Sequence, residues 1–214
     1  MRPDEILEAV RENARDTVDF LGNARKVERE RSVCAAFLRC AGVEFSSDEL
    51  VRSAVEPPDV TFGDARFEVM VCLRPGRPMH GEWKKRQKRY EAATTLRDLF
   101  EPYTAPRTIP QEELVGLLMP AAAGKAKHYA KTGAGCAQLD LLVYINDAVI
   151  LDPASPPPDP SNLAQQGWRS VSALVPPHAW TVFARDSAPQ FLMDLRTGPV
   201  ARSKPPLGAG LFGL

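Results

Sequence analysis

Apolar residues recur at two different periods along the chain, and these periods separate helices from strands. Spacings of three and four residues predict helices over 4–21, 24–41, 81–100, 111–119, 120–131 and 189–195. β-Branched and aromatic runs predict strands on either side of Gly63-Asp64 and over 139–146, 172–175 and 179–184, with shorter extended pieces at 43–45, 107–109 and 147–151. The run over 139–146 is apolar almost throughout, which is typical of a strand covered on both faces. This order of elements predicts an α/β domain with a mixed sheet.

The stretch from Glu56 to Leu73 carries the clearest local signal. Two strand-like runs flank Gly63-Asp64, and Gly in the first central position suits a two-residue type II′ turn. That loop length fixes the register, so Asp59 is expected to lie opposite Glu68, with their Cβ atoms about 4.5–5.5 Å apart. Two carboxylates at that separation repel each other unless a cation lies between them. Mg²⁺ is the usual cation, since it is commonly held by one or two carboxylates.

A second interpretation of the hairpin needs no cation. A surface hairpin can carry Asp and Glu on its solvent side, and a turn one residue longer would shift the register. The second strand favours the first interpretation, because Met70 and Cys72 share a face with Glu68 while Phe67 and Val69 share the other. Met and Cys are not typical solvent-facing residues. Glu68 is therefore expected on a covered face, where a carboxylate needs a partner.

Glu30 falls on the apolar stripe of the predicted helix over 24–41. A carboxylate on the core-facing side of a helix needs a counter-charge. An ion pair with Arg25 or Arg31 near the surface would provide one.

Composition indicates one globular domain over 1–197 and a Pro/Gly-rich tail over 198–214. The chain has 214 residues, of which 44% are hydrophobic and 25% charged. No secretory signal and no apolar run of the ~18 residues that a membrane helix needs are visible. The four cysteines lack zinc-like spacing and are too sparse for a disulfide scaffold. A cytoplasmic protein that does not bind membranes is expected, and its oligomeric state is left open, with a homodimer possible.

Positive charge is concentrated in the middle of the chain, although the net charge is zero. Residues 74–131 hold 12 Lys and Arg against 6 Asp and Glu. Five of these cations fall within six positions of the predicted helix over 81–100, and such a cluster suits contact with nucleic-acid phosphates. An ordinary solvated helix is the alternative. The candidate nucleic-acid-binding residues are Lys84, Lys85, Arg86, Lys88 and Arg89.

Pro58-Asp59, followed by an acidic residue on the next strand at Glu68, resembles the PD-(D/E)xK motif of the restriction-endonuclease-like superfamily. The runs over 23–31 and 166–170, together with the hairpin, are similar to a small, uncharacterised family of bacterial "putative endonucleases". The resemblance covers residues 5–195 and implies a restriction-endonuclease-like fold: one domain whose mixed sheet contains an antiparallel hairpin and is flanked by helices. It also implies that Asp59 and Glu68 bind Mg²⁺ or Mn²⁺, with Glu30 as a third ligand from the first core helix and Glu28, which lies off the apolar stripe, as the second choice for that position.

The resemblance is incomplete at one position. The superfamily places a lysine two residues after the second acid, where it helps to activate the attacking water, and this chain has Met70 there. Lys125, on the predicted helix over 120–131, is the candidate replacement. The resemblance thus implies a metal-dependent nuclease with Asp59, Glu68 and Lys125 as catalytic residues, acting on DNA in preference to RNA. The alternative is a catalytically impaired module of the same fold that binds nucleic acid or a protein partner.

Overall fold

The computed structural model describes residues 2–72, 79–100, 105–145, 149–152 and 154–201. Its elements, in chain order, are α1 (Pro3–Leu21), α2 (Lys26–Ala41), β1 (Val51–Arg52), β2 (Val60–Phe62), β3 (Ala65–Cys72), α3 (Met79–Ala92), β4 (Arg107–Pro110), α4 (Gln111–Thr132), β5 (Asp140–Ile145), β6 (Val149–Asp152), α5 (Ser161–Ala164), β7 (Ser170–Val175), β8 (His178–Ala184) and α6 (Gln190–Asp194). Short 3₁₀ helices cover Asn23–Arg25, Leu96–Leu99 and Leu195–Thr197.

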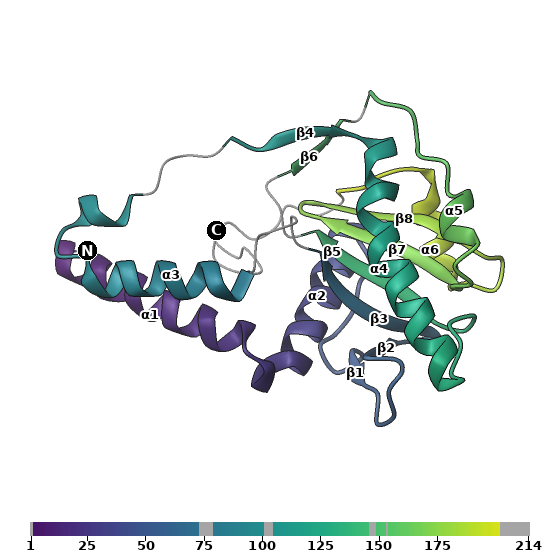
Figure 1. Ribbon diagram of the computed structural model, residues 1–214, viewed down its shortest axis with the longest axis horizontal. Helices are drawn as coiled ribbons and strands as arrows, with labels where there is room; N and C mark the ends of the chain where they lie inside the picture. The colour runs from purple at the N-terminus through teal and green to yellow at the C-terminus, as the bar shows by residue number, and fades with distance from the viewer. Residues whose placement is uncertain (1, 73–78, 101–104, 146–148, 153, 202–214) are drawn as a thin grey trace.

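Six strands form one mixed sheet in the order β1-β2-β3-β5-β7-β8 (Figure 1). The hairpin β2–β3 is antiparallel, β3 pairs in parallel with β5, β5 pairs in parallel with β7, and β7–β8 is antiparallel. The predicted α/β fold with a mixed sheet flanked by helices is confirmed. β5 is the buried central strand beside the hairpin, as its apolar run predicted, and all six of its residues are buried.

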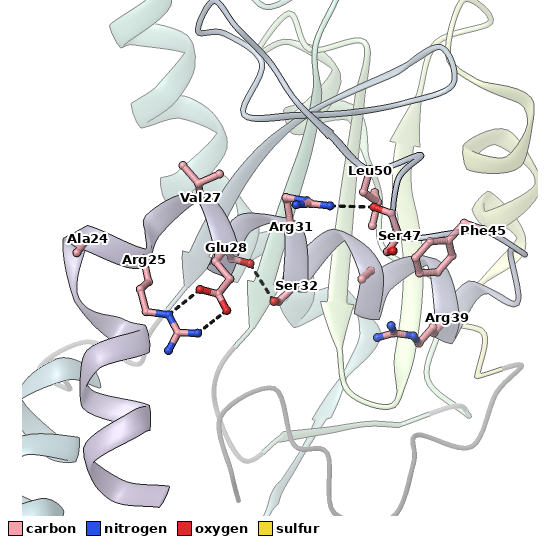
Figure 2. Close-up of a pocket in the computed structure, with 11 residues that line it drawn as sticks. Ala24, Arg25, Val27, Glu28, Arg31, Ser32, Arg39, Phe45, Ser47 and Leu50 are labelled. Atoms are coloured by element: carbon pink, nitrogen blue, oxygen red, sulfur yellow. Dashed lines mark hydrogen bonds and ion pairs between the residues drawn. The ribbon is translucent and has the colours of Figure 1, made fainter. Parts of the chain in front are cut away.

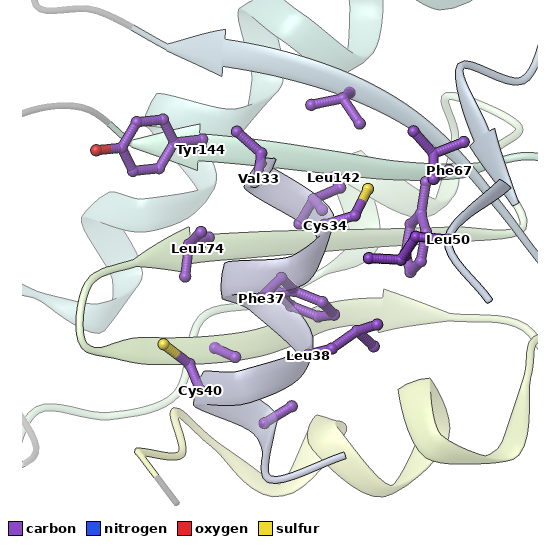
Figure 3. Packing of buried hydrophobic residues seen from close by; sticks show 14 of the residues in the cluster. Val33, Cys34, Phe37, Leu38, Cys40, Leu50, Phe67, Leu142, Tyr144 and Leu174 are labelled. Atoms are coloured by element: carbon purple, nitrogen blue, oxygen red, sulfur yellow. The ribbon is translucent and has the colours of Figure 1, made fainter. Parts of the chain in front are cut away.

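Helices cover both faces of the sheet and enclose two apolar clusters. α2 packs on one face, where Val33, Phe37 and Leu38 meet Phe67 and Leu142 of the sheet (Figure 3). α4 contributes its buried residues to the cluster on the opposite face, together with alternate residues of β5 and β7. The faces of β3 divide as predicted: Phe67, Val69 and Val71 belong to the α2 cluster, and Met70 and Cys72 to the α4 cluster.

α1 and α3 lie side by side at one end of the molecule and run in opposite directions (Figure 1). The Arg11 guanidinium donates to the carbonyl oxygens of Tyr90 (3.2 Å) and Ala93 (2.7 Å), which satisfies carbonyl groups at the end of α3. α3 is shorter than the helix predicted over 81–100. It ends at Ala92, and a 3₁₀ turn follows in which the Asp98 carboxylate accepts from the N–H groups of Thr94 and Thr95.

Two other sequence-based boundaries are wrong. The helices predicted over 111–119 and 120–131 form one continuous helix, α4, with Pro120 inside it. Buried Leu114, Leu118 and Ala122 continue one apolar face across the proline, so packing outweighs the lost backbone hydrogen bond. The piece expected at 43–45 is not a strand, and the edge strand β1 instead forms at Val51–Arg52, where it pairs with β2.

Candidate functional site

The hairpin has the predicted register, with Phe62 opposite Ala65, Thr61 opposite Arg66, and Val60 opposite Phe67. The ladder stops there, so Asp59 and Glu68 do not form the expected cross-strand pair. Asp59 instead donates its backbone N–H to the Phe67 carbonyl (2.9 Å) and accepts at its own carbonyl from the Ser53 N–H (3.3 Å). Its backbone is thereby shared between β3 and the segment that follows β1.

The Asp59 side chain is held at the edge of β3. Its Oδ2 accepts from the Val69 N–H at 2.9 Å, in a position where a paired strand would otherwise provide a carbonyl. The carboxylate is buried, with 3% of the side chain exposed. Oδ2 is thus bound to the backbone. Oδ1 lies toward the first turn of α2, where it contacts Lys26.

Three carboxylates surround the ammonium group of Lys26, which stands at the start of α2. Lys26 Nζ lies 3.3 Å from Glu30 Oε1, 3.5 Å from Asp59 Oδ1 and 3.7 Å from Glu56 Oε1. Glu30 and Asp59 are buried, whereas Glu56 is exposed. The structure therefore brings together two of the three carboxylates predicted to bind a metal, and a lysine lies against both.

The counter-charge of Glu30 is neither of the expected arginines. Arg25 forms an ion pair with Glu28, and Arg31 donates to the Ser47 carbonyl at 2.8 Å. Glu30 pairs with Lys26 because residues four apart on a helix face one another. The prediction that Glu30 faces the core is confirmed, since the residue is 7% exposed.

Burial dominates the electrostatics of Glu30. Desolvation, and after it the charge of Asp59, raises the pKa of Glu30, Lys26 opposes both, and the net result is a pKa of about 7. The pKa of Lys26 is raised overall, since the attraction of Asp59, Glu30 and Glu56 exceeds the lowering effect of its own partial burial. Burial, with Asp59 and Glu30 nearby, also raises the pKa of the Cys34 thiol, so Cys34 is a protonated packing residue.

Glu68 lies on the α4 side of the sheet and has different partners. Its Oε1 forms an ion pair with Lys125 Nζ, and the Tyr129 hydroxyl donates a hydrogen bond to its carboxylate. Lys125 and Tyr129 are one helical turn apart on α4, and the ammonium lies 5.8 Å from the centre of the phenol ring. Burial and the charge of Glu68 raise the pKa of Tyr129 well above its ordinary value. Glu68 and Lys125, two of the three predicted catalytic residues, are therefore in direct contact.

The predicted metal ligands fit a hard divalent cation in part. Glu30 and Asp59 each direct a carboxylate oxygen to one point, now taken by Lys26, and two carboxylates completed by water suit Mg²⁺. Among the described residues, however, no group of three or more His, Cys, Asp and Glu side chains is arranged to hold a metal ion. Glu68, the third predicted ligand, is linked to Glu30 and Asp59 only through the backbone: it directly precedes Val69, whose N–H binds Asp59.

The basic residues of α3 divide into two kinds. Lys84, Lys85 and Lys88 are exposed, as a surface that contacts phosphates requires. Arg86 lies over the ring of Trp83 and Arg89 over that of Tyr90, each with its guanidinium carbon 5.0 Å from the ring centre. The two arginines are half-buried, so the accessible charge of α3 comes mainly from the lysines.

A groove of about 410 Å³ lies between α2 and the segment over 45–50 (Figure 2). Arg25, Arg31 and Arg39 line it together with a single carboxylate, Glu28, so its formal charge is positive. The ring of Phe45 also lines it and lies beneath the Arg39 guanidinium at 5.5 Å. Lys26 and Glu30 belong to the same turns of α2 but lie on another face of the helix, and neither they nor Asp59 line the groove.

Sequence reasoning assigned no role to Lys26, Tyr129 or the pair formed by Asp140 and Arg169. Asp140 is fully buried, and Arg169 binds both of its carboxylate oxygens. The four-residue spacings from Lys26 to Glu30 and from Lys125 to Tyr129 were visible signals of shared helix faces. No comparable signal joins Asp140 to Arg169, which meet only because β5 and β7 are neighbours.

A family model described as "Putative endonuclease, protein of unknown function" matches residues 2–200. The chain belongs to this family. A similar solved structure comes from Pseudomonas aeruginosa strain PAO1 and is described as a protein of unknown function of the monooxygenase superfamily; it is 30% identical, with 95% of this chain and 97% of that one covered and a TM-score of 0.67. No curated protein matches. In this member of the putative endonuclease family, no helix within the described residues has the length and apolar character needed to cross a membrane.

Proposed function

We propose that this family member is a metal-dependent nuclease that hydrolyses phosphodiester bonds. One observation carries the proposal: two buried carboxylates, Glu30 and Asp59, converge on a single cationic group, the half-exposed ammonium of Lys26. Burying carboxylates costs free energy, so a pair held this close needs a compensating function or a strong counter-charge. Membership of a family described as putative endonucleases favours the functional explanation.

Glu30 and Asp59 would hold Mg²⁺ or Mn²⁺. Glu68, the third predicted ligand, lies on β3 directly before Val69, which binds Asp59. When bound, the ion would supply a water of lowered pKa and stabilise negative charge on the phosphoryl oxygens. The hydrogen bond from Val69 fixes the Asp59 carboxylate and keeps Oδ1 directed away from the strand. Preorganisation of this kind lowers the cost of assembling the site when substrate arrives.

Lys125 would take the role of the lysine that Met70 replaces. Its ammonium is oriented by Glu68, and about 30% of the side chain remains exposed, so it can contact a phosphoryl oxygen while keeping its ion pair. Tyr129 orients the same carboxylate from the next turn of α4 and remains a neutral phenol. The Lys125 ammonium, oriented by Glu68, would then lie beside the scissile phosphate.

Two basic surfaces would bind the nucleic-acid backbone: the exposed lysines of α3 and the arginine-lined groove beside α2. Lysine and arginine contacts of this kind release counterions from the nucleic acid, so affinity should fall steeply as salt is added. DNA is the expected substrate in preference to RNA.

The proposal is tested with labelled DNA and RNA in the presence of Mg²⁺ or Mn²⁺. Asp59→Asn should reduce cleavage at least about 100-fold, because the neutral amide loses metal affinity while its oxygen can still accept from Val69. Asp186→Asn is the matched control: it makes the same change at an exposed position after β8. Equal rates of cleavage by wild type and Asp59→Asn would show that Asp59 is not part of the catalytic site.

The second candidate is a nuclease-fold module that binds nucleic acid without cutting it. The specific observation in its favour is that lysines already neutralise the buried carboxylates, and that Met70 stands at the motif lysine position. Salt-dependent binding with no metal-dependent cleavage would select this function.

A further inference from the structure

Lys26 is placed where a bound cation would be expected. Its ammonium lies within 3.7 Å of an oxygen from each of Glu30, Asp59 and Glu56, which come from α2 and from the segment leading into β2. A divalent cation bound by Glu30 and Asp59 would have to approach the same oxygens. The ammonium and the ion cannot both occupy that point, since each needs direct oxygen contact and like charges repel.

The position of Lys26 allows it to leave. About 48% of its side chain is exposed, whereas the side chains of Glu30 and Asp59 are 9% and 3% exposed. The two carboxylates are fixed by the helix and by the Val69 N–H, but a lysine side chain has a flexible four-carbon stem. Displacing the ammonium into water therefore requires no rearrangement of the backbone.

We propose that Lys26 is a built-in competitor of the divalent cation, and that it sets the affinity of the Glu30–Asp59 pair for metal. In the absence of metal the ammonium neutralises the two buried carboxylates and keeps the fold stable. Metal binding is an exchange in which the ammonium moves out to solvent, with Glu56 at the rim as its remaining partner. This inference rests on the proposed function, because it assumes that these two carboxylates bind metal.

The first experiment measures Mn²⁺ affinity by electron paramagnetic resonance of the free ion. Lys26→Met removes the charge and keeps a flexible, unbranched side chain of slightly smaller length, and it should bind Mn²⁺ at least about tenfold more tightly than wild type. That factor corresponds to about 1.4 kcal/mol of competition. Lys127→Met makes the same change at an exposed position on α4 and should match wild type. If wild type binds Mn²⁺ and Lys26→Met binds it equally well or more weakly, the inference about Lys26 is wrong while the proposed function stands.

Absence of Mn²⁺ binding by both wild type and Lys26→Met would have a different meaning. It would show that the carboxylates are not metal ligands, and both the proposed function and this inference would fall together.

A second experiment uses wild-type protein and needs no substitution. Mass spectrometry follows the rate at which an amine-reactive reagent acetylates Lys26, with and without Mg²⁺. The rate should rise several-fold with Mg²⁺ as the ammonium leaves the carboxylates, while the rate at Lys127 stays constant. Unchanged or slower modification of Lys26 under conditions where Mg²⁺ binds contradicts the exchange.

Discussion

Arg169 binds Asp140 through two nitrogen atoms, Nε to Oδ1 at 3.0 Å and Nη2 to Oδ2, and both residues are buried in the sheet. Arg169 Nη2 also donates to the Asp64 carbonyl in the hairpin turn (2.9 Å), and the Arg66 N–H donates to Asp140 Oδ2 (2.9 Å). The Ser170 hydroxyl completes the set at 2.8 Å. This network ties the hairpin to the centre of the sheet and so positions the carboxylates that precede and follow the turn.

Loss of the guanidinium should strongly destabilise the protein. Arg169→Met leaves the Asp140 carboxylate buried without its counter-charge, which costs about 3–5 kcal/mol in the free energy of unfolding. Urea denaturation measures the difference. Arg196→Met, at an exposed position, should fall within about 0.5 kcal/mol of wild type. A similar small effect of Arg169→Met would mean that the network does not hold the hairpin.

Stability should depend on pH through Glu30. Its pKa is about 7 in the folded protein against an ordinary 4.5, so the folded state holds the proton more tightly than the unfolded state. The free energy of unfolding of wild type should therefore fall, relative to Glu30→Gln, as pH rises from about 4.5 to about 7, and the difference should then level off. The groups that face Glu30 are Lys26, Asp59 and Glu56, with the Cys34 thiol protonated throughout.

Urea denaturation across this pH range, with chelator present, measures the Glu30 effect. Glu28→Gln is the control. Glu28 is an exposed residue of the same helix whose pKa Arg25 lowers, so it titrates below the window. A constant difference between wild type and Glu30→Gln over the window would contradict the prediction.

Removing the Tyr129 hydroxyl should have a modest effect on stability. Tyr129→Phe takes one hydrogen bond from the buried Glu68 carboxylate while Lys125 remains, and about 1–2 kcal/mol should be lost in the free energy of unfolding. Since its pKa is raised, Tyr129 should not ionise near pH 10, the ordinary pKa of a tyrosine, and ultraviolet titrations of wild type and Tyr129→Phe should coincide up to about pH 11. An extra tyrosine titrating in wild type near pH 10 would show that the phenol is not held by Glu68.

The lysines of α3 should contribute to the salt dependence of nucleic-acid binding. The double variant Lys84→Gln/Lys88→Gln should bind DNA more weakly and reduce the slope of log affinity against log salt by about 0.9 for each lost phosphate contact. Lys127→Gln/Lys131→Gln removes two exposed lysines with the same four-residue spacing on α4 and is the control. Fluorescence anisotropy at several salt concentrations measures both, and identical slopes would exclude α3 from the interface.

Local patterns predicted much of the fold correctly. The register at Phe62–Ala65, the two faces of β3 and the central position of β5 each follow from short-range periodicity and turn geometry. Pro120 does not end a helix as its missing N–H predicts, because the apolar face that α4 presents to the sheet outweighs the lost backbone hydrogen bond.

The candidate site was predicted less completely. Asp59 was expected opposite Glu68, yet its N–H bonds to Phe67 and its carboxylate to Val69, an arrangement that depends on where β1 and its following segment lie. Lys26 reaches Asp59 across 33 positions of sequence, and Lys125 reaches Glu68 across 57. Contacts at such separations arise from tertiary packing, which periodicity within one element does not encode.

The position of β5 has a consequence for synthesis on the ribosome. β3 pairs on one side with β2, its sequence neighbour, but on the other with β5, which begins at Asp140, and β5 in turn needs β7, which begins at Ser170. The nascent hairpin therefore has an unpaired edge until β5, Asp140–Ile145, has been translated. N-terminal fragments that stop before Asp140 should not fold, and such edges are where premature self-association starts.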